Sequence, residues 1–359
     1  MDFDPVFYVD YQLPSSFELR VCAYRVPLRH RFRGITERSG LLLHGPAGWA
    51  EVSPFWDYGV AYSARWLMGG IDAAVNGYPE IRRQNIPVNA TIPAVEPEAA
   101  YSIARASTAK SAKVKIAEPG HSLNTDCERL AAVRDALGND AQLRVDINAR
   151  WSAEYAISAI PHLDTAARGL EYVEQPCASV EALGQVRRAV GVRIAADESI
   201  RRAADPFQVV RAQAADLVVL KNQPLGGVRA ALALAEQLGL PVVVSSALES
   251  SVGLYAGVRL AAALPELPFA CGLATAQLLA DDVSADPLLP TNGEIAVHTA
   301  PLPVDGRGGN DPKAGILTAN SGGAHAQLIA RWAQRLADMW SYLQYRGQLS
   351  EAAHYTWVC

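Results

Sequence analysis

The sequence predicts a (β/α)-barrel preceded by a smaller α+β domain. Short apolar segments recur about every 25 residues between residues 87 and 275, and segments of helical period lie between them. The chain has 359 residues, half of them hydrophobic, which is enough for one large core and a second domain. Strand–helix units of this number and spacing are typical of an eight-stranded parallel barrel.

Eight apolar segments are the candidate barrel strands. They are "PVNATIP" (87–93), "AKVKIA" (112–117), "QLRVDINA" (142–149), "EYVEQP" (171–176), "RIAADES" (193–199), "DLVVLKNQ" (216–223), "PVVVSSALES" (241–250) and "FACGLAT" (269–275). Alternating strands and helices also occur in doubly wound sheets. No GxGxxG or phosphate-binding loop follows any of these segments, so the barrel is favoured.

The remaining sequence predicts three further parts. Residues 1–85 are rich in strand and turn signals and then become helical, which predicts an α+β capping domain before the barrel of residues 86–285. Part of the Gly- and Pro-rich stretch 286–320 is expected to join the capping domain. An amphipathic helix and a tail, residues 321–359, are expected to pack against the body.

Composition limits the partners of the protein. The formal net charge of −5 argues against nucleic-acid binding, and no run of roughly 20 apolar residues predicts a membrane span. Five scattered cysteines without a CxxC pair, and an N-terminus without an apolar signal segment, predict a cytoplasmic protein. The expected partner is a small carboxylate substrate, and the sequence predicts no oligomeric state.

Charged residues end five consecutive candidate strands. They are Lys115, Asp146, Glu174, Asp197 and Lys221. The carboxyl ends of barrel strands meet at one mouth, where active sites of this fold lie, so we expect these side chains to converge. One such acid is most often a salt-bridge partner at the surface. Three on adjacent strands, with a lysine on either side, instead predict a Mg²⁺ site, because three converging carboxylates repel unless a hard cation neutralises them.

Lys113 and Lys115, which are separated by one residue, share a face of the second candidate strand. A like charge and a nearby metal favour the neutral form of a lysine, which is the form that accepts a proton. A base facing a metal-held carboxylate predicts removal of the proton α to that carboxylate, with stabilisation of the enediolate. Lys221, across the mouth, is expected to act as acid, second base or electrostatic stabiliser.

Several motifs resemble the enolase superfamily, in the subgroup of muconate lactonising enzymes, dipeptide epimerases and o-succinylbenzoate synthases. They are "KVK", "VDINARW", "EYVEQP", "ADES" and "LKNQPLGG", and the resemblance covers about residues 20–285. "SSALESSVGL" (245–254) and "CGLAT" (271–275) are similar to the o-succinylbenzoate synthase family, although Cys271 replaces its usual histidine. "RFRGITERSGLLL" (31–43) resembles the loop with which that family faces its substrate.

The resemblance implies dehydration of 2-succinyl-6-hydroxy-2,4-cyclohexadiene-1-carboxylate to o-succinylbenzoate in menaquinone biosynthesis, with Mg²⁺ that Mn²⁺ can replace. It implies that Lys115 is the base, that Lys221 stabilises the enediolate and that Lys113 assists electrostatically. Asp146, Glu174 and Asp197 match the metal ligands. Asn148 and Glu198 match positions that orient those ligands.

The residues that hold the succinyl tail are less sharply defined. Backbone amides of Ser245, Ser246, Gly272 and Leu273 are candidates, although ordinary loop capping explains the two serines equally well. Arg144 is a further candidate, but it precedes Asp146 by two residues, which is deeper in the barrel.

Three alternative functions use the same residues. N-succinylamino acid racemisation requires a lysine on each side of the α-carbon, and one enzyme of this family can perform both reactions. A muconate-type cycloisomerase is disfavoured by the ESS and GL-x-T motifs. A barrel that only binds a metal or metabolite predicts a missing ligand or lysine, and none is missing.

Overall fold

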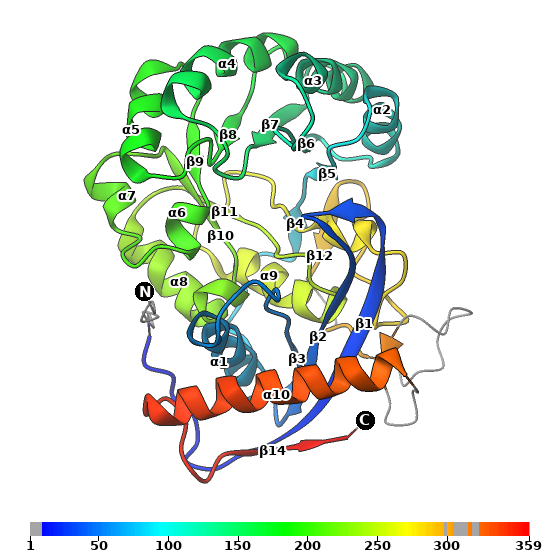
Figure 1. Ribbon diagram of the computed structural model, residues 1–359, viewed down its shortest axis with the longest axis vertical. Coiled ribbons are helices and arrows are strands. Elements are labelled where there is room, and N and C mark those ends of the chain that lie inside the picture. The colour runs from blue at the N-terminus through cyan, green and yellow to red at the C-terminus, as the bar shows by residue number, and fades with distance from the viewer. Residues whose placement is uncertain (1–8, 298–299, 304–314, 318–322, 359) are drawn as a thin grey trace.

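A closed parallel barrel forms the centre of the computed structural model, which describes residues 9–297, 300–303, 315–317 and 323–358 (Figure 1). Its strands form one sheet in the order β11-β10-β9-β8-β7-β6-β5. The strands are β5 (Ala90–Ile92), β6 (Ser111–Lys115), β7 (Gln142–Asp146), β8 (Tyr172–Glu174), β9 (Ile194–Ala196), β10 (Leu217–Leu220) and β11 (Val242–Val244). The predicted barrel is confirmed.

The eighth position of the barrel is filled by a short bridge. Cys271 pairs with Val88 before β5, and Gly272 pairs with Ser245 after β11, both in parallel. These two pairs close the ring. The strand predicted over residues 269–275 is therefore limited to two residues, because the 3₁₀ helix η2 (Ala274–Leu278) follows almost at once.

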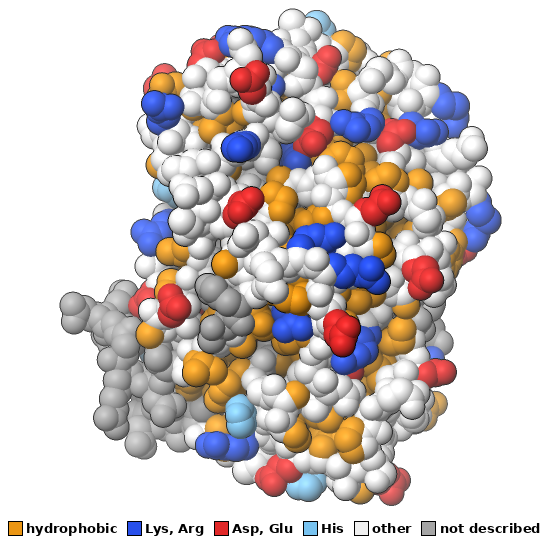
Figure 2. Space-filling view, turned by 180° about the vertical axis from the view of Figure 1, so that it is seen from behind, with side chains coloured by type: hydrophobic (Ala, Val, Ile, Leu, Met, Phe, Trp, Pro, Cys, Tyr) orange, Lys and Arg blue, Asp and Glu red, His pale blue; other side chains and the backbone are white. Residues whose placement is uncertain are grey.

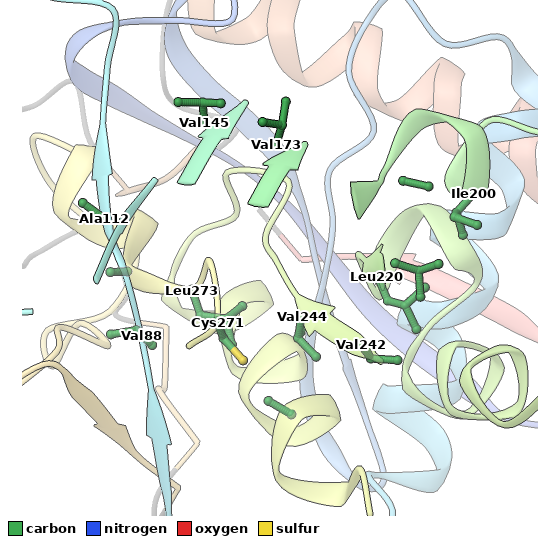
Figure 3. Packing of buried hydrophobic residues seen from close by; sticks show 14 of the residues in the cluster. Val88, Ala112, Val145, Val173, Ile200, Leu220, Val242, Val244, Cys271 and Leu273 are labelled. Atoms are coloured by element: carbon green, nitrogen blue, oxygen red, sulfur yellow. The ribbon is translucent and has the colours of Figure 1, made fainter. Parts of the chain in front are cut away.

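Helices surround the barrel on its outer side (Figure 1). They are α2 (Pro97–Ala106), α3 (Leu123–Leu137), α4 (Ala153–Ala166), α5 (Val180–Ala189), α6 (Glu198–Arg201), α7 (Gln208–Arg211), α8 (Val228–Leu238) and α9 (Ser251–Ala263), with the 3₁₀ helix η1 (Gln223–Leu225) before α8. Outward strand residues such as Val145, Val173 and Leu220 are buried in the core between strands and helices (Figure 3). Because side chains alternate along a strand, the intervening residues face the barrel interior.

The capping domain is built on a mostly antiparallel sheet. Its strands are β1 (Glu18–Phe32), β2 (Ile35–Gly45), β3 (Gly48–Val52), β13 (Gly315–Ile316) and β14 (His354–Trp357), and its helices are α1 (Val60–Asn76) and α10 (Ala324–Tyr345). The hairpin of β1 and β2 is the largest strand pairing in the molecule, and its turn at Arg33 and Gly34 uses positive φ angles of 50° and 79°. β14 lies parallel to β1, and β13 lies antiparallel to it.

Residues at the C-terminus complete the capping domain. α10 packs along α1 and crosses the lower edge of the molecule in the view of Figure 1. The sequence separated residues 321–359 from residues 1–85, but the pairing of β14 with β1 joins them, and we assign both to one domain.

Residues 286–320 divide between the two domains where they are described. β12 (Glu294–Ala296) pairs with β4 (Asn85–Pro87) beside the barrel, whereas β13 pairs with β1 in the capping sheet. Residues 298–299, 304–314 and 318–320 of this predicted segment lie outside the described residues.

Charged side chains of both signs cover the surface. On the face shown in Figure 2, lysines and arginines gather near the middle, among apolar side chains and with acidic ones nearby. Within the described part of the chain, no helix combines the length and apolar character needed to span a bilayer.

Truncating Trp332 should destabilise the protein strongly. This side chain of α10 is fully buried, donates to Ser39 Oγ at 3.2 Å and stacks on Trp56 with ring centroids 4.4 Å apart. We expect Trp332→Ala to lower the free energy of unfolding by about 3–5 kcal/mol in urea titration. Tyr345→Ala on the same helix, where the tyrosine is 87% exposed, is the matched control and should change it by less than about 0.5 kcal/mol. Equal effects would show that α10 is not anchored through Trp332.

Candidate active site

Three buried carboxylates lie in one layer at the carboxyl end of the barrel. Asp146 and Glu174 are the last residues of β7 and β8 and are paired in register, and Asp197 directly follows β9. Their side chains are at most 2% exposed. Strand pairing therefore brings together the three acids that the sequence predicted as metal ligands.

Three lysine ammonium groups contact these carboxylates. Lys113 Nζ lies 2.8 Å from Glu174 Oε2 and 3.6 Å from Asp146 Oδ2. Lys115 Nζ lies 2.6 Å from Asp146 Oδ2, and Lys221 Nζ lies 2.6 Å from Asp197 Oδ2. Lys113 and Lys115 share the inward face of β6, as predicted, with Lys113 deeper and Lys115 nearer the mouth.

The strand order places Lys115 and Lys221 across the mouth from each other. Lys115 ends β6 and Lys221 directly follows β10, and these strands are four positions apart in a ring of eight. Both side chains remain partly exposed, at 15% and 12%, so they lie above the buried acids. A molecule seated on the carboxylate layer would have an amine on either side.

The charges in this layer perturb one another. Burial raises the pKa of Asp146, but the Lys115 and Lys113 ammonium groups outweigh burial and hold it well below its usual range. Asp197 likewise has its pKa lowered to about 2, because Arg201 and Lys221 outweigh burial.

The third carboxyl group is shifted in the opposite direction. Burial and the nearby Asp146 carboxylate raise the pKa of Glu174 to about 7, although Lys113 acts to lower it. Burial lowers the pKa of Lys113, but the Glu174 and Asp146 carboxylates raise it by more than burial lowers it. This lysine therefore stays charged. The layer thus carries one carboxyl group that lacks sufficient positive charge around it.

Asn148 and Glu198 connect the acids to the lysines. The Asn148 amide donates to Glu198 Oε1 at 3.3 Å, its backbone N–H donates to Asp146 Oδ1 at 3.1 Å, and its Oδ1 accepts from Lys115 Nζ. Asn148 adopts a φ of 51°, a left-handed conformation that asparagine tolerates. The second Glu198 oxygen, Oε2, is buried without a partner among the described residues.

The donor set fits a hard divalent cation. Among the described residues, no three His, Cys, Asp or Glu side chains are grouped closely enough to form a ready metal site. Each acid instead faces an ammonium or guanidinium group. Nevertheless, oxygen-only donors, the raised pKa of Glu174 and the unpartnered Glu198 Oε2 are all features that a cation would satisfy.

The capping domain contributes an aromatic ring to the mouth. The Phe32 ring centroid lies 5.7 Å from Lys115 Nζ, and Phe32 ends β1 directly before the hairpin turn. Phe32 belongs to the segment of residues 31–43 that resembles a substrate-facing loop, so this segment reaches Lys115. The site is therefore built by both domains.

Three of the residues predicted to hold the succinyl tail use their backbone N–H groups in the hydrogen bonds that close the barrel. The backbone N–H groups of Ser245, Ser246 and Gly272 donate to Leu220, Gly272 and Val244 carbonyls at 2.8–3.0 Å. The Ser246 hydroxyl bonds to Thr275 Oγ1 at 2.7 Å. In these contacts the two serines and Gly272 close the barrel.

Leu273 also has a packing role. Its side chain is fully buried beside Cys271 in the core outside the strands (Figure 3). The role predicted for the Leu273 backbone amide is separate from this side-chain packing and stays a prediction.

Arg144 lies below the site. It faces the interior one layer deeper than Asp146, donates to the Ala270 carbonyl at 2.6 Å and to the Tyr172 hydroxyl at 3.2 Å, and pairs with Glu171. Its side chain is fully buried, so it stabilises the barrel floor and does not reach the mouth. The prediction that Arg144 contacts the substrate is therefore corrected: two residues along a strand is one full layer of barrel interior.

Sequence reasoning missed Arg201, the cationic partner of Asp197. Arg201 Nε donates to Asp197 Oδ1 at 2.9 Å, and Nη2 donates to Glu198 Oε1 at 2.7 Å. The signal was present in "DESIR", since an acid and an arginine four residues apart meet on a helix. Gln175 was also missed. Its side-chain Oε1 accepts a hydrogen bond from the Asp197 backbone N–H at 2.8 Å.

A buried network that joins the domains was missed as well. Glu51 of β3 accepts from the Tyr24 hydroxyl at 2.7 Å and from the Ser250 backbone N–H at 3.1 Å. Arg38 of β2 donates to the Leu248 carbonyl at 2.9 Å. Sequence motifs that resemble a substrate-facing loop and an ESS segment thus meet in space, a contact no local pattern predicts.

Comparison with known proteins agrees with this architecture. Residues 23–74 match the enolase N-terminal domain-like family, and residues 97–302 match the enolase C-terminal domain-like family. The fold and the site therefore define a member of the enolase superfamily.

Sequence relatives narrow the class. The chain is 59% identical over 276 residues to the o-succinylbenzoate synthase of Thermobifida fusca, which covers 77% of this chain and 86% of that protein. It is 50% identical over 288 residues to the o-succinylbenzoate synthase of Mycobacterium leprae, covering 79% and 85%. The chain belongs to the o-succinylbenzoate synthase family.

Solved structures support the fold. The L-Ala-D/L-Glu epimerase from Bacillus subtilis matches with a TM-score of 0.67 at 21% identity, covering 80% of this chain and 97% of that chain. The N-succinyl Arg/Lys racemase from Bacillus cereus matches with a TM-score of 0.67 at 19% identity, covering 80% and 94%.

Replacing Arg144 should affect stability and leave substrate affinity nearly unchanged. Arg144→Met leaves the Glu171 carboxylate buried without its cation, so we expect the free energy of unfolding to fall by about 3–5 kcal/mol in urea titration. The KM of the folded variant should stay within about twofold of the original value, because no substrate contact is removed. A large rise in KM at unchanged stability would return Arg144 to the substrate site.

Proposed function

We propose that the protein converts 2-succinyl-6-hydroxy-2,4-cyclohexadiene-1-carboxylate to o-succinylbenzoate, with Lys115 as the base. The observation that carries this proposal is the pair of lysines facing each other across one buried carboxylate layer. The identity to curated o-succinylbenzoate synthases supports the choice of substrate. As a member of this family the protein is a carbon–oxygen lyase.

Lys115 is suited to both proton transfers of the dehydration. As a neutral amine it takes the ring proton α to the carboxylate, and the electrons of that C–H bond form the enediolate. The resulting ammonium then gives the proton to the departing hydroxyl on the same face, so that water leaves and the ring becomes aromatic. One residue serves both steps because proton and hydroxyl leave from one side.

The other two lysines stabilise charge. Lys221 approaches from the opposite face, where its ammonium stabilises the enediolate and interacts with the ring by a cation–π contact. Lys113 is held between Glu174 and Asp146 and stays charged, so its role is electrostatic.

We propose that Asp146, Glu174 and Asp197 hold a Mg²⁺ ion, which Mn²⁺ can replace. When bound, the cation would supply a positive charge that stabilises the two enediolate oxygens. Asn148 and Glu198 orient the acids through the hydrogen bonds described above. We also place the reaction in menaquinone biosynthesis in the cytoplasm, which follows from the family resemblance.

N-succinylamino acid racemisation is a second candidate activity. The opposed positions of Lys115 and Lys221 favour it, since each can exchange a proton with one face of an α-carbon. The same geometry serves dehydration, so the two activities must be separated by assay.

A turnover comparison with Mg²⁺ tests the proposed function. One reaction follows the loss of cyclohexadiene absorbance, and the other follows the optical rotation of an N-succinylamino acid. Rapid dehydration with negligible racemisation is the expected result. Racemisation without dehydration would overturn the proposal in favour of the second activity.

Removing the base should abolish turnover. Lys115→Ala is expected to lower kcat for dehydration by at least about 1000-fold, because no other group in the layer holds the same position. Lys110→Ala, which removes an exposed lysine just before the same strand, is the control and should keep kcat. Near-original turnover of Lys115→Ala would show that another group is the base.

Each proposed metal ligand should be needed for Mg²⁺ binding. Asp146→Asn, Glu174→Gln and Asp197→Asn are each expected to weaken Mg²⁺ binding at least about tenfold in titration calorimetry, because each removes a charged oxygen donor. Asp216→Asn is the control, since Asp216 pairs with Arg187 at the other end of the barrel. A variant with an unchanged Mg²⁺ titration would exclude that residue as a ligand.

A further inference from the structure

Arg201 occupies a central position behind the catalytic layer. Its guanidinium donates to both neighbouring acids, Asp197 and Glu198. Asp197 pairs with Lys221. Glu198 accepts from Asn148, which in turn accepts from Lys115. One guanidinium therefore links the two lysines, through Asp197 to Lys221 and through Glu198 and Asn148 to Lys115.

The capping domain holds Arg201 from behind. Arg201 Nη1 donates to the Tyr58 hydroxyl at 3.0 Å, just before α1 begins. The Arg201 carbonyl accepts from the Tyr62 hydroxyl at 2.7 Å and from Arg65 Nη2 at 3.0 Å, both on α1. Side chain and main chain are thus fixed by one segment of the other domain.

Tyr58 extends this connection to the hairpin. Its hydroxyl also accepts from Arg33 Nη2 at 2.8 Å, and Arg33 forms the turn between β1 and β2. The Arg33 guanidinium lies over the Phe55 ring at 3.9 Å. The chain of contacts therefore runs from the turn beside Phe32, through Tyr58 and Arg201, to both acids.

We propose that Arg201 is a positioning residue that makes the orientation of Asp197 and Glu198, and through them of both lysines, depend on the docked capping domain. The guanidinium is 6% exposed and uses Nε, Nη1 and Nη2 for three different partners, so it cannot turn without releasing one of them. A planar fork with fixed donor directions is suited to this task, whereas a lysine offers one point charge. This proposal rests on the proposed roles of Lys115 and Lys221.

Kinetic comparison of three variants tests the proposal. Arg201→Lys keeps the charge and removes the fork, and we expect kcat for dehydration to fall about 100-fold with KM changed by less than about threefold. Tyr58→Phe removes one hydroxyl and keeps the ring that packs on Phe55 and Trp66. It should lower kcat about tenfold. The double variant should be no slower than Arg201→Lys, because Tyr58 acts through Arg201.

Arg187→Gln is the matched control. Arg187 Nε donates to Asp216 Oδ1 at 2.8 Å, nearly the geometry of the Arg201–Asp197 pair, at the opposite end of the barrel. The kcat of Arg187→Gln should stay within about twofold of the value of the unchanged protein. The proposal is overturned if Arg201→Lys keeps its kcat, if the two losses simply multiply in the double variant, or if Arg187→Gln is equally slow.

Hydrogen exchange gives a readout that needs no turnover. Peptides covering residues 197–202 should exchange faster in Tyr58→Phe than in the unchanged protein, and those in Arg187→Gln should not. Unchanged exchange in Tyr58→Phe would overturn the proposal. Absence of both dehydration and racemisation in the unchanged protein would overturn the proposed function alone, and exchange would still decide the role of Arg201.

Discussion

Burying three carboxylates in one layer of the barrel is the constraint on which the site depends. An isolated buried charge costs several kcal/mol, so Asp146, Glu174 and Asp197 can coexist only beside cations. Lysines from β6 and after β10 supply part of that charge, and Arg201 supplies more. The balance remains incomplete at Glu174, whose pKa is raised to about 7. A site built in this way is stable enough to fold and still favours an additional cation.

The capping domain also contacts the charged groups of this layer. Phe32 approaches the Lys115 ammonium group, and Tyr58 contacts the Arg201 guanidinium behind the acids. Glu51, buried at the junction, binds the Ser250 main chain from the loop after β11. Lys115 at the end of β6 and Ser250 after β11 are therefore both contacted by strands of the capping sheet. The side chains around the carboxylate layer are therefore held by contacts from both domains.

Much of the barrel was predictable because strand parity and strand order follow from local sequence. The period of about 25 residues and the charged strand ends are sufficient to place Lys115 and Asp146 at one mouth. Strand spacing places Arg144 deeper than Asp146, but it could not show that the guanidinium is bound by Glu171, Tyr172 and the Ala270 carbonyl. Nor could it show that the Gly272 amide is consumed by barrel closure. Contacts between distant segments, such as Tyr58 with Arg201, leave no local pattern at all.

Two segments far apart in the sequence meet in the capping sheet, where β14 lies alongside β1. Glu18 in β1 pairs with His354 in β14, and the whole barrel lies between them in the sequence. During synthesis β1 therefore cannot pair with β14 until the barrel has been translated. The ribosome therefore releases every barrel strand before the sheet beside the active site can gain its last strand. A chain that stops short of α10 would carry every charged side chain of the carboxylate layer and still lack the helix that packs along α1. Synthesis of α10 and β14 is thus a structural requirement for a complete capping domain.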